Sequence, residues 1–309
     1  MVQENRVMSE EKILVVCGPT ASGKSALAVT LAEKYNGEIV SADSVSVYKK
    51  LNIGSAKPSQ DEMRNIPHYM IDVVDEFENF SVSDYEKMAL PIVYDILSRG
   101  KLPIICGGTG FYINSLLYER SYGMSRGNED FRKLYNEKLR IYGNKFVWEE
   151  LNAIDPQTAA KLHFNDTVRV VRALEIYYST GIRKSEIMDS NTARFDYLAI
   201  MPNFKRDILY ERINHRVELM IKNGLENEIR DLISDGVTLL NQCMQGIGYK
   251  ESYEAIIKNE EIPVEDIKQN SRRYAKRQLT FFKKMQPYLF DVSGETSENE
   301  LYKKIDDFL

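Results

Sequence analysis

The chain has 309 residues, of which 43% are hydrophobic and 28% charged, and its net charge is −5 at pH 7. These ordinary values exclude a disordered or fibrous chain. No apolar run reaches the roughly 20 residues that span a bilayer, and the N-terminus lacks the apolar core of a signal peptide. We therefore expect no membrane partner and a cytoplasmic location. The three cysteines lie far apart, which argues against a disulfide framework or a zinc site.

Predicted strands and helices alternate over the first hundred residues. Strands are predicted at 12–17, KILVVC, at 38–43, EIVSAD, and at 102–108, LPIICGG. Helices are predicted at 24–35 and at 83–100, with Gly37 and Gly100 as stop signals. This alternation predicts an α/β fold with a parallel sheet, whose ligands bind at the carboxyl ends of the strands.

The helix predicted at 83–100 carries two local signals. Ser83 and Glu86 have the spacing of a capping box at its start. Pro91 lies inside it and predicts a kink.

Residues 119–195 break the alternation and predict an all-helical insertion domain. They contain no convincing strand, and their helix-like segments are 129–142, 145–152 and 165–180. The expected domains are therefore a core made of 1–118 and 196–309, and the insertion.

The sheet is expected to resume after the insertion. An apolar run at 195–202, FDYLAIMP, predicts a strand, and a last short strand is predicted at 288–293. Between them lie long amphipathic helices, predicted at 207–223, 225–234 and 264–285.

A phosphate-binding loop is predicted at residues 18–25. The stretch GPTASGKS fits G-x-x-x-x-G-K-[ST], with Gly18, Gly23, Lys24 and Ser25 at the fixed positions. The glycines let backbone N–H groups cradle phosphate oxygens, Lys24 supplies a cation, and the Ser25 hydroxyl is a ligand for Mg²⁺. The alternative is a tight turn without a ligand. The motif follows a predicted strand and opens a predicted helix, which favours phosphate binding.

The strand predicted at 102–108 does not end in an acidic residue. A P-loop kinase usually carries an acid there to organise Mg²⁺, but this strand runs into Gly107, Gly108, Thr109 and Gly110. The backbone and the Thr109 hydroxyl are able to bind phosphate oxygen but not to act as an acid or base. The alternative is a glycine turn between a strand and a helix.

Asp43 ends the strand predicted at 38–43. If that strand is parallel to the strand before the P-loop, Asp43 and Lys24 open into the same crevice. A carboxylate beside a bound phosphate then accepts a proton or orients a Mg²⁺ shell. A helix N-cap or turn aspartate is an equally weighted alternative.

Three predicted helices carry basic faces. The residues are Arg169 and Arg172; Arg206, Arg212 and Arg216; and Arg272, Arg273, Lys276 and Arg277. Each face alone is typical of a solvated helix surface. Three of them in a net-acidic chain favour an anion of the size of RNA.

Eight segments resemble signatures of the tRNA dimethylallyltransferase (IPP transferase) family, in the family's order. They are GPTASGKS, SADSVSVYKKLNIGSAKP, PHYMIDVV, GGTGFYINSLL, NDTVRVVRALEIYYSTG, YERINHRVELMIKNGLENEI, QGIGYKES and RRYAKRQLTFFKK, and they are spread over nearly the whole chain between residues 13 and 286. The chain is similar to the shorter bacterial form, without the zinc finger of eukaryotic relatives. The resemblance implies a P-loop NTPase-like core, with a parallel sheet flanked by helices, plus the helical insertion domain.

The resemblance also implies the reaction and the residues that carry it. The P-loop would hold the diphosphate of dimethylallyl diphosphate, and no phosphoryl group would be transferred. Asp43 would be the general base for the N6 amino group of the adenosine just 3′ of the tRNA anticodon. Lys24, Thr109 and Arg216 would hold the departing diphosphate, with Mg²⁺ bound through Ser25. The implied diphosphate-binding residues are Gly18, Thr20, Ala21, Ser22, Gly23, Lys24, Ser25 and Arg216.

The implied RNA partner is the anticodon stem-loop of tRNA, gripped by the insertion domain of a monomer. The positions that match tRNA-contacting regions are Asp43, Ser44, Val45, Ser46, Arg169, Arg172, Gln245, Gly246, Gly248, Tyr249, Lys250 and Arg277. Many relatives have Met-Gln in place of Val45-Ser46 and Trp in place of Phe281.

Two other functions compete with this interpretation. A P-loop kinase of a small metabolite would need an acid for Mg²⁺, which Asp43 or Asp72 would supply, and it leaves the basic helices unexplained. An RNA-binding protein with a relic nucleotide loop has no use for a base at a strand end. An assay distinguishes the three functions. A kinase consumes ATP, an RNA-binding protein with an inactive loop consumes no substrate, and a prenyltransferase releases diphosphate only when RNA is present.

Overall fold

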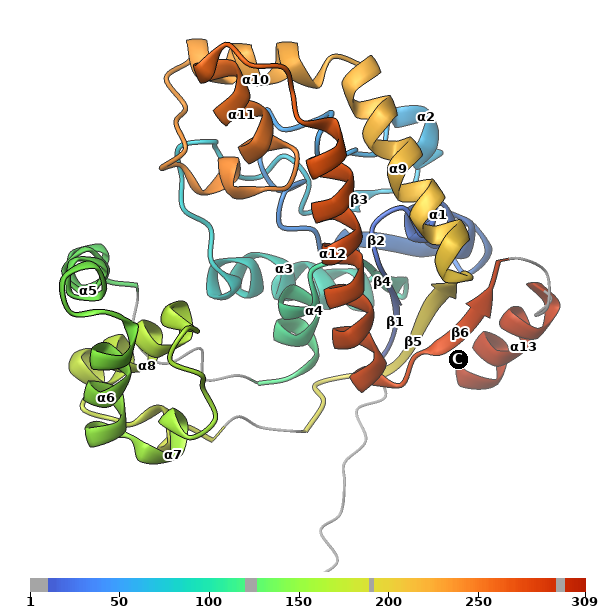
Figure 1. The fold of residues 1–309 in the computed structure, drawn as a ribbon. Coiled ribbons are helices and arrows are strands. Elements are labelled where there is room, and N and C mark those ends of the chain that lie inside the picture. Colours follow the sequence, from blue (N-terminus) through green and yellow to red (C-terminus); the bar gives the residue numbers. More distant parts are fainter. Residues whose placement is uncertain (1–10, 120–126, 189–191, 293–297) are drawn as a thin grey trace, which may run out of the picture. The chain divides into compact units, whose positions relative to one another are not determined.

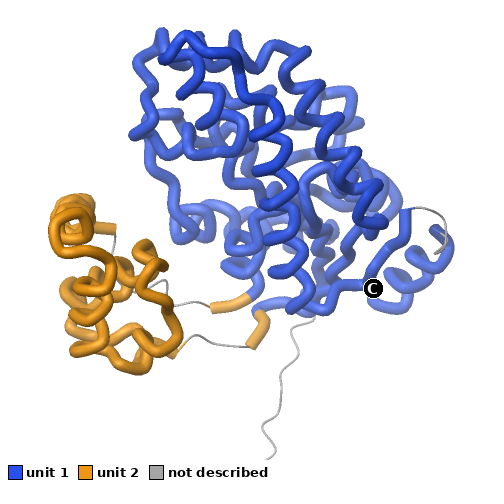
Figure 2. Tube along the Cα trace, in the orientation of Figure 1, with its two compact units in different colours: residues 1–117, 194–309 blue, residues 118–193 orange. Residues whose placement is uncertain are grey.

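The computed structural model describes residues 11–119, 127–188, 192–292 and 298–309 (Figure 1). The chain divides into two compact units, one formed by Met1–Leu117 with Arg194–Leu309 and the other by Tyr118–Ala193 (Figure 2). These bounds lie one or two residues from the boundaries expected at 119 and 195.

A six-stranded parallel sheet forms the centre of the larger unit. Its strands are β1 (Lys12–Cys17), β2 (Gly37–Ser41), β3 (His68–Tyr69), β4 (Leu102–Gly107), β5 (Asp196–Asn203) and β6 (Tyr288–Asp291). Their order is β3-β2-β4-β1-β5-β6, and every neighbouring pair is parallel. The α/β fold with a parallel sheet is thus confirmed. The two-residue strand β3 was not predicted, because it is too short for a periodic pattern.

Strand β1 owes its apolar sequence to its place in the sheet. It lies between β4 and β5, so Leu14 is paired with Ile104 on one side and with Leu198 on the other. Residues 13–17 are all fully buried. A strand covered on both faces reads as a continuous apolar run rather than as an alternating one. The same position makes the carboxyl end of β1 the middle of the sheet edge.

The helices of the larger unit surround this sheet. They are α1 (Lys24–Lys34), α2 (Gln60–Met63), α3 (Val82–Ser98), α4 (Gly110–Leu117), α9 (Arg206–Lys222), α10 (Leu225–Ser234), α11 (Tyr249–Lys258), α12 (Val264–Phe282) and α13 (Glu298–Phe308). Helices α1 and α13 share one core cluster with alternate residues of β1, β2 and β4. Helices α9 and α12 pack against each other along the unit (Figure 1). The helices α2, α4, α11 and α13 were not predicted.

The start of α3 corrects a sequence prediction. The capping box is formed by Ser81 and Asp84, not by Ser83 and Glu86: the Ser81 hydroxyl accepts a hydrogen bond from the Asp84 N–H, and Asp84 caps the Ser81 N–H. Aspartate at the third helical position serves as well as glutamate, so the helix begins two residues earlier. Glu86 instead pairs with Arg194.

The smaller unit is helical over its described residues. It contains α5 (Glu129–Tyr142), α6 (Asn144–Ile154), α7 (Pro156–Ala159) and α8 (Thr167–Thr180), followed by a 3-10 turn at Lys184–Glu186. Val147, Leu151, Val170 and Leu174 lie in its own hydrophobic core. None of the described helices in either unit is long and apolar enough to cross a membrane.

A buried carboxylate ties the amino end of β2 to its surroundings. Glu38 is 1% exposed and accepts a two-pronged ion pair from Arg99, at 2.7 and 2.6 Å. Lys101 and the Tyr69 hydroxyl donate to the same carboxylate at 2.6 and 2.8 Å. The Arg99 hydrogen bonds, helped by those of Lys101 and Tyr69, lower the pKa of Glu38 from 4.5 to about 2 despite its burial.

We expect this group to link stability to pH. A folded-state pKa below the unfolded value contributes stability that is present above pH 4.5 and is lost as pH falls toward about 2. Glu38→Gln should lower the free energy of unfolding at neutral pH by about 2 kcal/mol, measured by urea denaturation. The difference from the wild-type protein should shrink below pH 4.5.

The matched control is Glu33→Gln, which removes the exposed ion pair with Arg64 and should cost about 0–1 kcal/mol. A Glu38→Gln penalty that stays constant down to acidic pH would contradict the assignment.

Candidate phosphate-binding active site

The P-loop takes the conformation that its sequence requires. Gly23 precedes α1 with a φ of 76°, in the left-handed region that glycine adopts without strain. Ala21 also has a positive φ, 61°. Left-handed residues in a loop before a helix turn successive N–H groups toward one side, which creates an anion-binding concavity. The buried Ser22 hydroxyl has no hydrogen-bond partner in the described protein.

Two helices from the far end of the chain hold the P-loop in place. The Arg212 guanidinium of α9 donates to the Ala21 carbonyl oxygen at 2.9 Å. The Gln278 side chain of α12 accepts from the Thr20 N–H at 2.9 Å and donates to the Gly108 carbonyl oxygen at 2.9 Å. Sequence reasoning missed Gln278, because a single amide in a basic helix carries no pattern.

The glycines after β4 are explained by close packing. A Cβ at Gly107 would lie 2.1 Å from the carbonyl oxygen of Ala42, and one at Gly110 would lie 2.2 Å from the Phe281 ring. One at Gly108 would lie 2.3 Å from the Gln278 amide nitrogen. Backbone packing therefore requires glycine at Gly107, whereas the close neighbours of Gly108 and Gly110 are side-chain atoms, in agreement with the turn interpretation.

Asp43 follows β2. Its two carboxylate oxygens fit the two interpretations of its role, as a turn aspartate and as a group that takes part in the chemistry. Its Oδ1 accepts hydrogen bonds from the N–H groups of Val45, at 2.9 Å, and Ser46, at 3.2 Å, and so forms a tight turn. Within the described parts of the chain no group donates to the other oxygen, Oδ2. One oxygen thus fixes the loop, while the other is left for chemistry.

Thr109 supports the same turn from β4. Its hydroxyl oxygen accepts from the Ser44 N–H at 3.0 Å, and its own N–H donates to Ala42 at 3.0 Å. The structure therefore places Thr109 behind the turn that carries Asp43.

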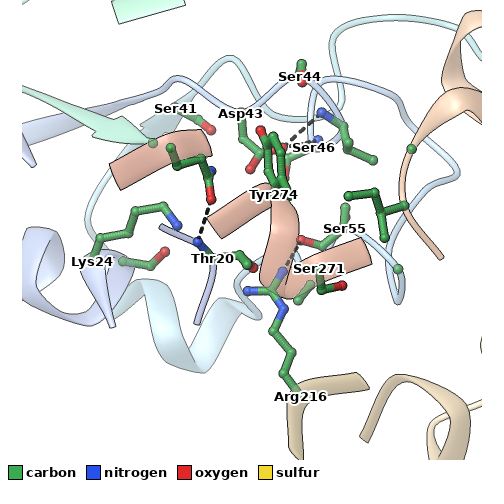
Figure 3. Close-up of a pocket in the computed structure, with 18 of the residues that line it drawn as sticks. Thr20, Lys24, Ser41, Asp43, Ser44, Ser46, Ser55, Arg216, Ser271 and Tyr274 are labelled. Carbon is green, nitrogen blue, oxygen red and sulfur yellow. Dashed lines mark hydrogen bonds between the residues drawn. The ribbon is translucent and has the colours of Figure 1, made fainter. Parts of the chain in front are cut away.

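A cavity of about 350 Å³ at this sheet edge collects most of the predicted residues. The side chains of Lys24, Asp43 and Arg216 converge on it (Figure 3). Predicted residues that line it are Thr20, Lys24, Ser25, Asp43, Ser44, Val45, Ser46, Arg216, Gln245, Gly246 and Arg277. Gly18, Ala21, Ser22, Gly23, Thr109, Gly248, Tyr249 and Lys250 lie outside its lining.

The cavity concentrates positive charge. Burial, and then the charge of Arg216, lower the pKa of Lys24, whose ammonium donates to the Pro19 carbonyl oxygen at 3.3 Å. Burial also lowers the pKa of Arg216, which donates to the Ser55 carbonyl oxygen at 3.0 Å. The Nε of Arg216 is buried and has no partner in the described protein. Two cations with spare donors that face one cavity form a site for a multivalent anion.

Tyr274 of α12 is a further residue of this cavity, and sequence reasoning did not single it out. Burial, followed by the charge of Asp43, raises its pKa to about 12. The phenol therefore stays neutral at physiological pH and is able to donate a hydrogen bond.

Tyr249 was expected to contact tRNA, but its side chain is packed inside the protein. It is fully buried, and its hydroxyl donates to Glu228 at 2.6 Å. The same carboxylate accepts from the N–H groups of Asn52 and Ile53, at 2.9 and 2.8 Å. This network supports the loop that presents Ser55 to Arg216.

Arg169 and Arg172 belong to the smaller unit. Arg169 pairs with Asp166 at 3.2 Å and remains largely exposed. Arg172 pairs with the buried carboxylate of Glu175, which also accepts from Arg132 and from the Asn128 N–H. Within this unit Arg172 thus has a structural partner, whereas Arg169 faces solvent.

No dedicated metal site made of three or more His, Cys, Asp or Glu side chains occurs among the described residues. Asp72, the second acid considered for a kinase, is not among the residues lining the cavity and pairs with Lys57. Ser25 and Asp43 remain as oxygen donors beside the P-loop. Mg²⁺ is commonly bound through one or two protein oxygens plus substrate phosphates and water, so these residues fit such an ion.

Comparisons with known proteins identify the family. The family model described as "IPP transferase" matches residues 46–285. A protein of Thermoanaerobacter sp. (strain X514) called tRNA dimethylallyltransferase is 47% identical over 280 residues, which cover 88% of this chain and 89% of that protein.

Solved structures are similar over nearly the whole chain. The full-length tRNA isopentenylpyrophosphate transferase of Bacillus halodurans has a TM-score of 0.71 at 38% identity and covers 97% of this chain and 95% of its own. A eukaryotic dimethylallyltransferase, solved acting on tRNA, has a TM-score of 0.81 at 32% identity and covers 96% of this chain and 78% of its own.

We expect binding of inorganic diphosphate to take up protons. The pKa of free Lys24 is lowered below 10.5, and a bound anion should raise it again. Affinity should therefore weaken as pH rises through the lowered pKa, and calorimetry across that pH range, in buffers of different ionisation enthalpy, should detect proton uptake. Lys24→Met should abolish the uptake and cost about 1–3 kcal/mol of binding. Lys34→Met, on the same helix, should change neither quantity.

Proposed function

The chain belongs to the IPP transferase family, and we propose that it transfers the dimethylallyl group of dimethylallyl diphosphate to an adenosine of tRNA. The observation that carries the proposal is the convergence of Lys24, Arg216 and the P-loop on the same cavity as Asp43. One side of this cavity is built for a leaving diphosphate, and the other carries a carboxylate oxygen without a partner. Prenyl transfer to an amine needs both.

The target we propose is the N6 amino group of the adenosine just 3′ of the anticodon, within the anticodon stem-loop. In the reaction the amine nitrogen forms a bond to the allylic carbon while the bond from that carbon to the diphosphate oxygen breaks. The electron pair leaves with diphosphate, and the amine proton passes to Asp43. A base in a loop is cheap to unstack compared with a base in a duplex.

Stabilisation of the leaving group is the main task of the cations. As diphosphate departs, the allylic carbon gains cationic character and the diphosphate oxygens gain negative charge. Lys24 and Arg216 line the cavity in which this charge would develop, and the P-loop would add its N–H groups. Because they are held by the fold, little reorganisation is needed at the moment of reaction.

Mg²⁺ fits this site as a partner of the diphosphate. Ser25 would hold it directly, and the substrate oxygens and water would supply its other ligands. When bound, the ion would neutralise part of the charge on the leaving group.

Asp43 is well placed to be the general base. Its Oδ1 is committed to the Val45 and Ser46 N–H groups, which fixes the direction of Oδ2. Proton removal by a positioned carboxylate typically contributes about 10²–10⁴-fold to the rate. The residues that follow it, Ser44 to Ser46, also line the cavity, so we propose that they contact the target base.

We propose that RNA reaches the cavity along α11 and α12. Arg277 lines the cavity and is exposed, and Lys250 is exposed at the start of α11. Arg169 would add an exposed cation from the smaller unit. A monomer is the active form that we propose. The cytoplasm is the compartment that we propose, since its substrate is tRNA.

The direct test is nucleoside mass spectrometry after incubation with Mg²⁺, dimethylallyl diphosphate and an unmodified anticodon stem-loop. One C5H8 unit should appear on the adenosine just 3′ of the anticodon. Asp43→Asn keeps the oxygen that forms the turn but removes the base, so it should lower kcat by about 10²-fold or more. RNA affinity should change little.

Asp61→Asn is the control, an exposed aspartate of α2 that should leave the rate unchanged. Consumption of ATP with no adduct would favour the kinase function instead. A fully active Asp43→Asn protein would remove Asp43 from the mechanism.

A further inference from the structure

Helix α12 contacts both glycine-rich loops of the site through one side chain. Gln278 is 6% exposed, accepts a hydrogen bond from the Thr20 N–H of the P-loop and donates one to the Gly108 carbonyl oxygen after β4. The two bonds join segments that are separated from Gln278 by 258 and 170 residues. The uncharged amide of glutamine offers an acceptor to one loop and a donor to the other.

The Gly108 loop leads directly to the turn of the catalytic base. The residue after Gly108 is Thr109, whose hydroxyl oxygen accepts from the Ser44 N–H at 3.0 Å. Ser44 follows Asp43 in the chain. A short path of bonds therefore runs from the P-loop, through Gln278 and Thr109, to the turn that aims Asp43.

We propose that Gln278 is a positioning residue that sets the distance between the diphosphate cradle and the catalytic base. This inference rests on the proposed prenyl transfer and adds a residue that lines the cavity and whose amide atoms are bonded to the two loops. The P-loop and the Asp43 turn come from different strands, β1 and β2, which are not neighbours, because β4 lies between them. The sheet alone does not fix how the two loops approach each other above its edge.

The role predicts a particular kinetic signature. The P-loop N–H groups, Lys24 and Arg216 remain when the Gln278 amide is lost, so ground-state binding of diphosphate should persist. The alignment of nitrogen, allylic carbon and leaving oxygen should suffer, and a misplacement of about 1 Å costs on the order of 10²-fold in rate. A positioning residue of this kind is therefore detected in kcat rather than in affinity.

Gln278→Leu is the first variant, because leucine is of similar size and lacks the amide oxygen and nitrogen that make the two hydrogen bonds. We expect kcat for adduct formation to fall by about 10–100-fold. The affinity for inorganic diphosphate, measured by calorimetry without RNA, should change by less than about threefold. Gln269→Leu is the matched control, an exposed glutamine on the same helix, and should behave as the wild-type protein.

Gly108→Ala tests the other end of the same bond. The added Cβ would lie 2.3 Å from the Gln278 amide nitrogen but 3.6 Å from its Cδ, so it should displace the amide of glutamine and tolerate leucine. Gly108→Ala should therefore reduce kcat in the wild-type protein and have little further effect in the Gln278→Leu protein. Such non-additivity is expected only for residues that act together.

Three results would overturn the inference: an unchanged kcat in Gln278→Leu, an equal loss from Gly108→Ala in both backgrounds, or a lowered melting temperature with normal kcat in the folded protein. Failure of the proposed function is distinguishable, since the wild-type and Gln269→Leu proteins would then form no adduct.

Discussion

Two half-buried cations that face one cavity are the constraint on which the rest of the structure depends. Burial removes hydration from Lys24, and the charge of Arg216 repels it. Both effects lower the pKa of Lys24. Among the described residues, Asp43 is the only carboxylate that lines the cavity with them. Such an excess of positive charge in a poorly solvated space costs free energy until an anion arrives. The surrounding fold has to hold these side chains in place against that cost.

The supporting contacts come from both sides of the site. Arg212 and Gln278 hold the P-loop, and Glu228 with Tyr249 holds the loop that anchors Arg216 through Ser55. None of these four side chains forms part of a recognised phosphate-binding motif. The chemistry of the site thus rests on a small set of charged and polar groups, while its geometry rests on long-range hydrogen bonds.

This difference between the chemical groups and the hydrogen bonds that hold them explains which features could be predicted from the sequence. The P-loop, the strands that flank it and Asp43 were predictable, because each is encoded by neighbouring residues whose spacing has a direct physical meaning. The hydrogen bonds of Gln278, Glu228 and Tyr249 were not predictable, because their partners lie elsewhere in the chain. Short elements such as β3 and α2 are defined by their neighbours rather than by periodicity. The start of α3 was misplaced for a local reason, since two serine-based caps compete two residues apart.

The separation of 258 residues between Thr20 and Gln278 has a consequence for the newly made protein. During translation the P-loop leaves the ribosome early, together with β1, but the central strand lacks its neighbour β5 until residues 196–203 have been made. The smaller unit, with its own core and mostly local contacts, is complete before then. Contacts between distant segments form late and slowly. A nascent or truncated chain that ends before α12 would carry the whole phosphate-binding motif and yet have no finished site, so a damaged message would yield an inert fragment rather than a partial enzyme.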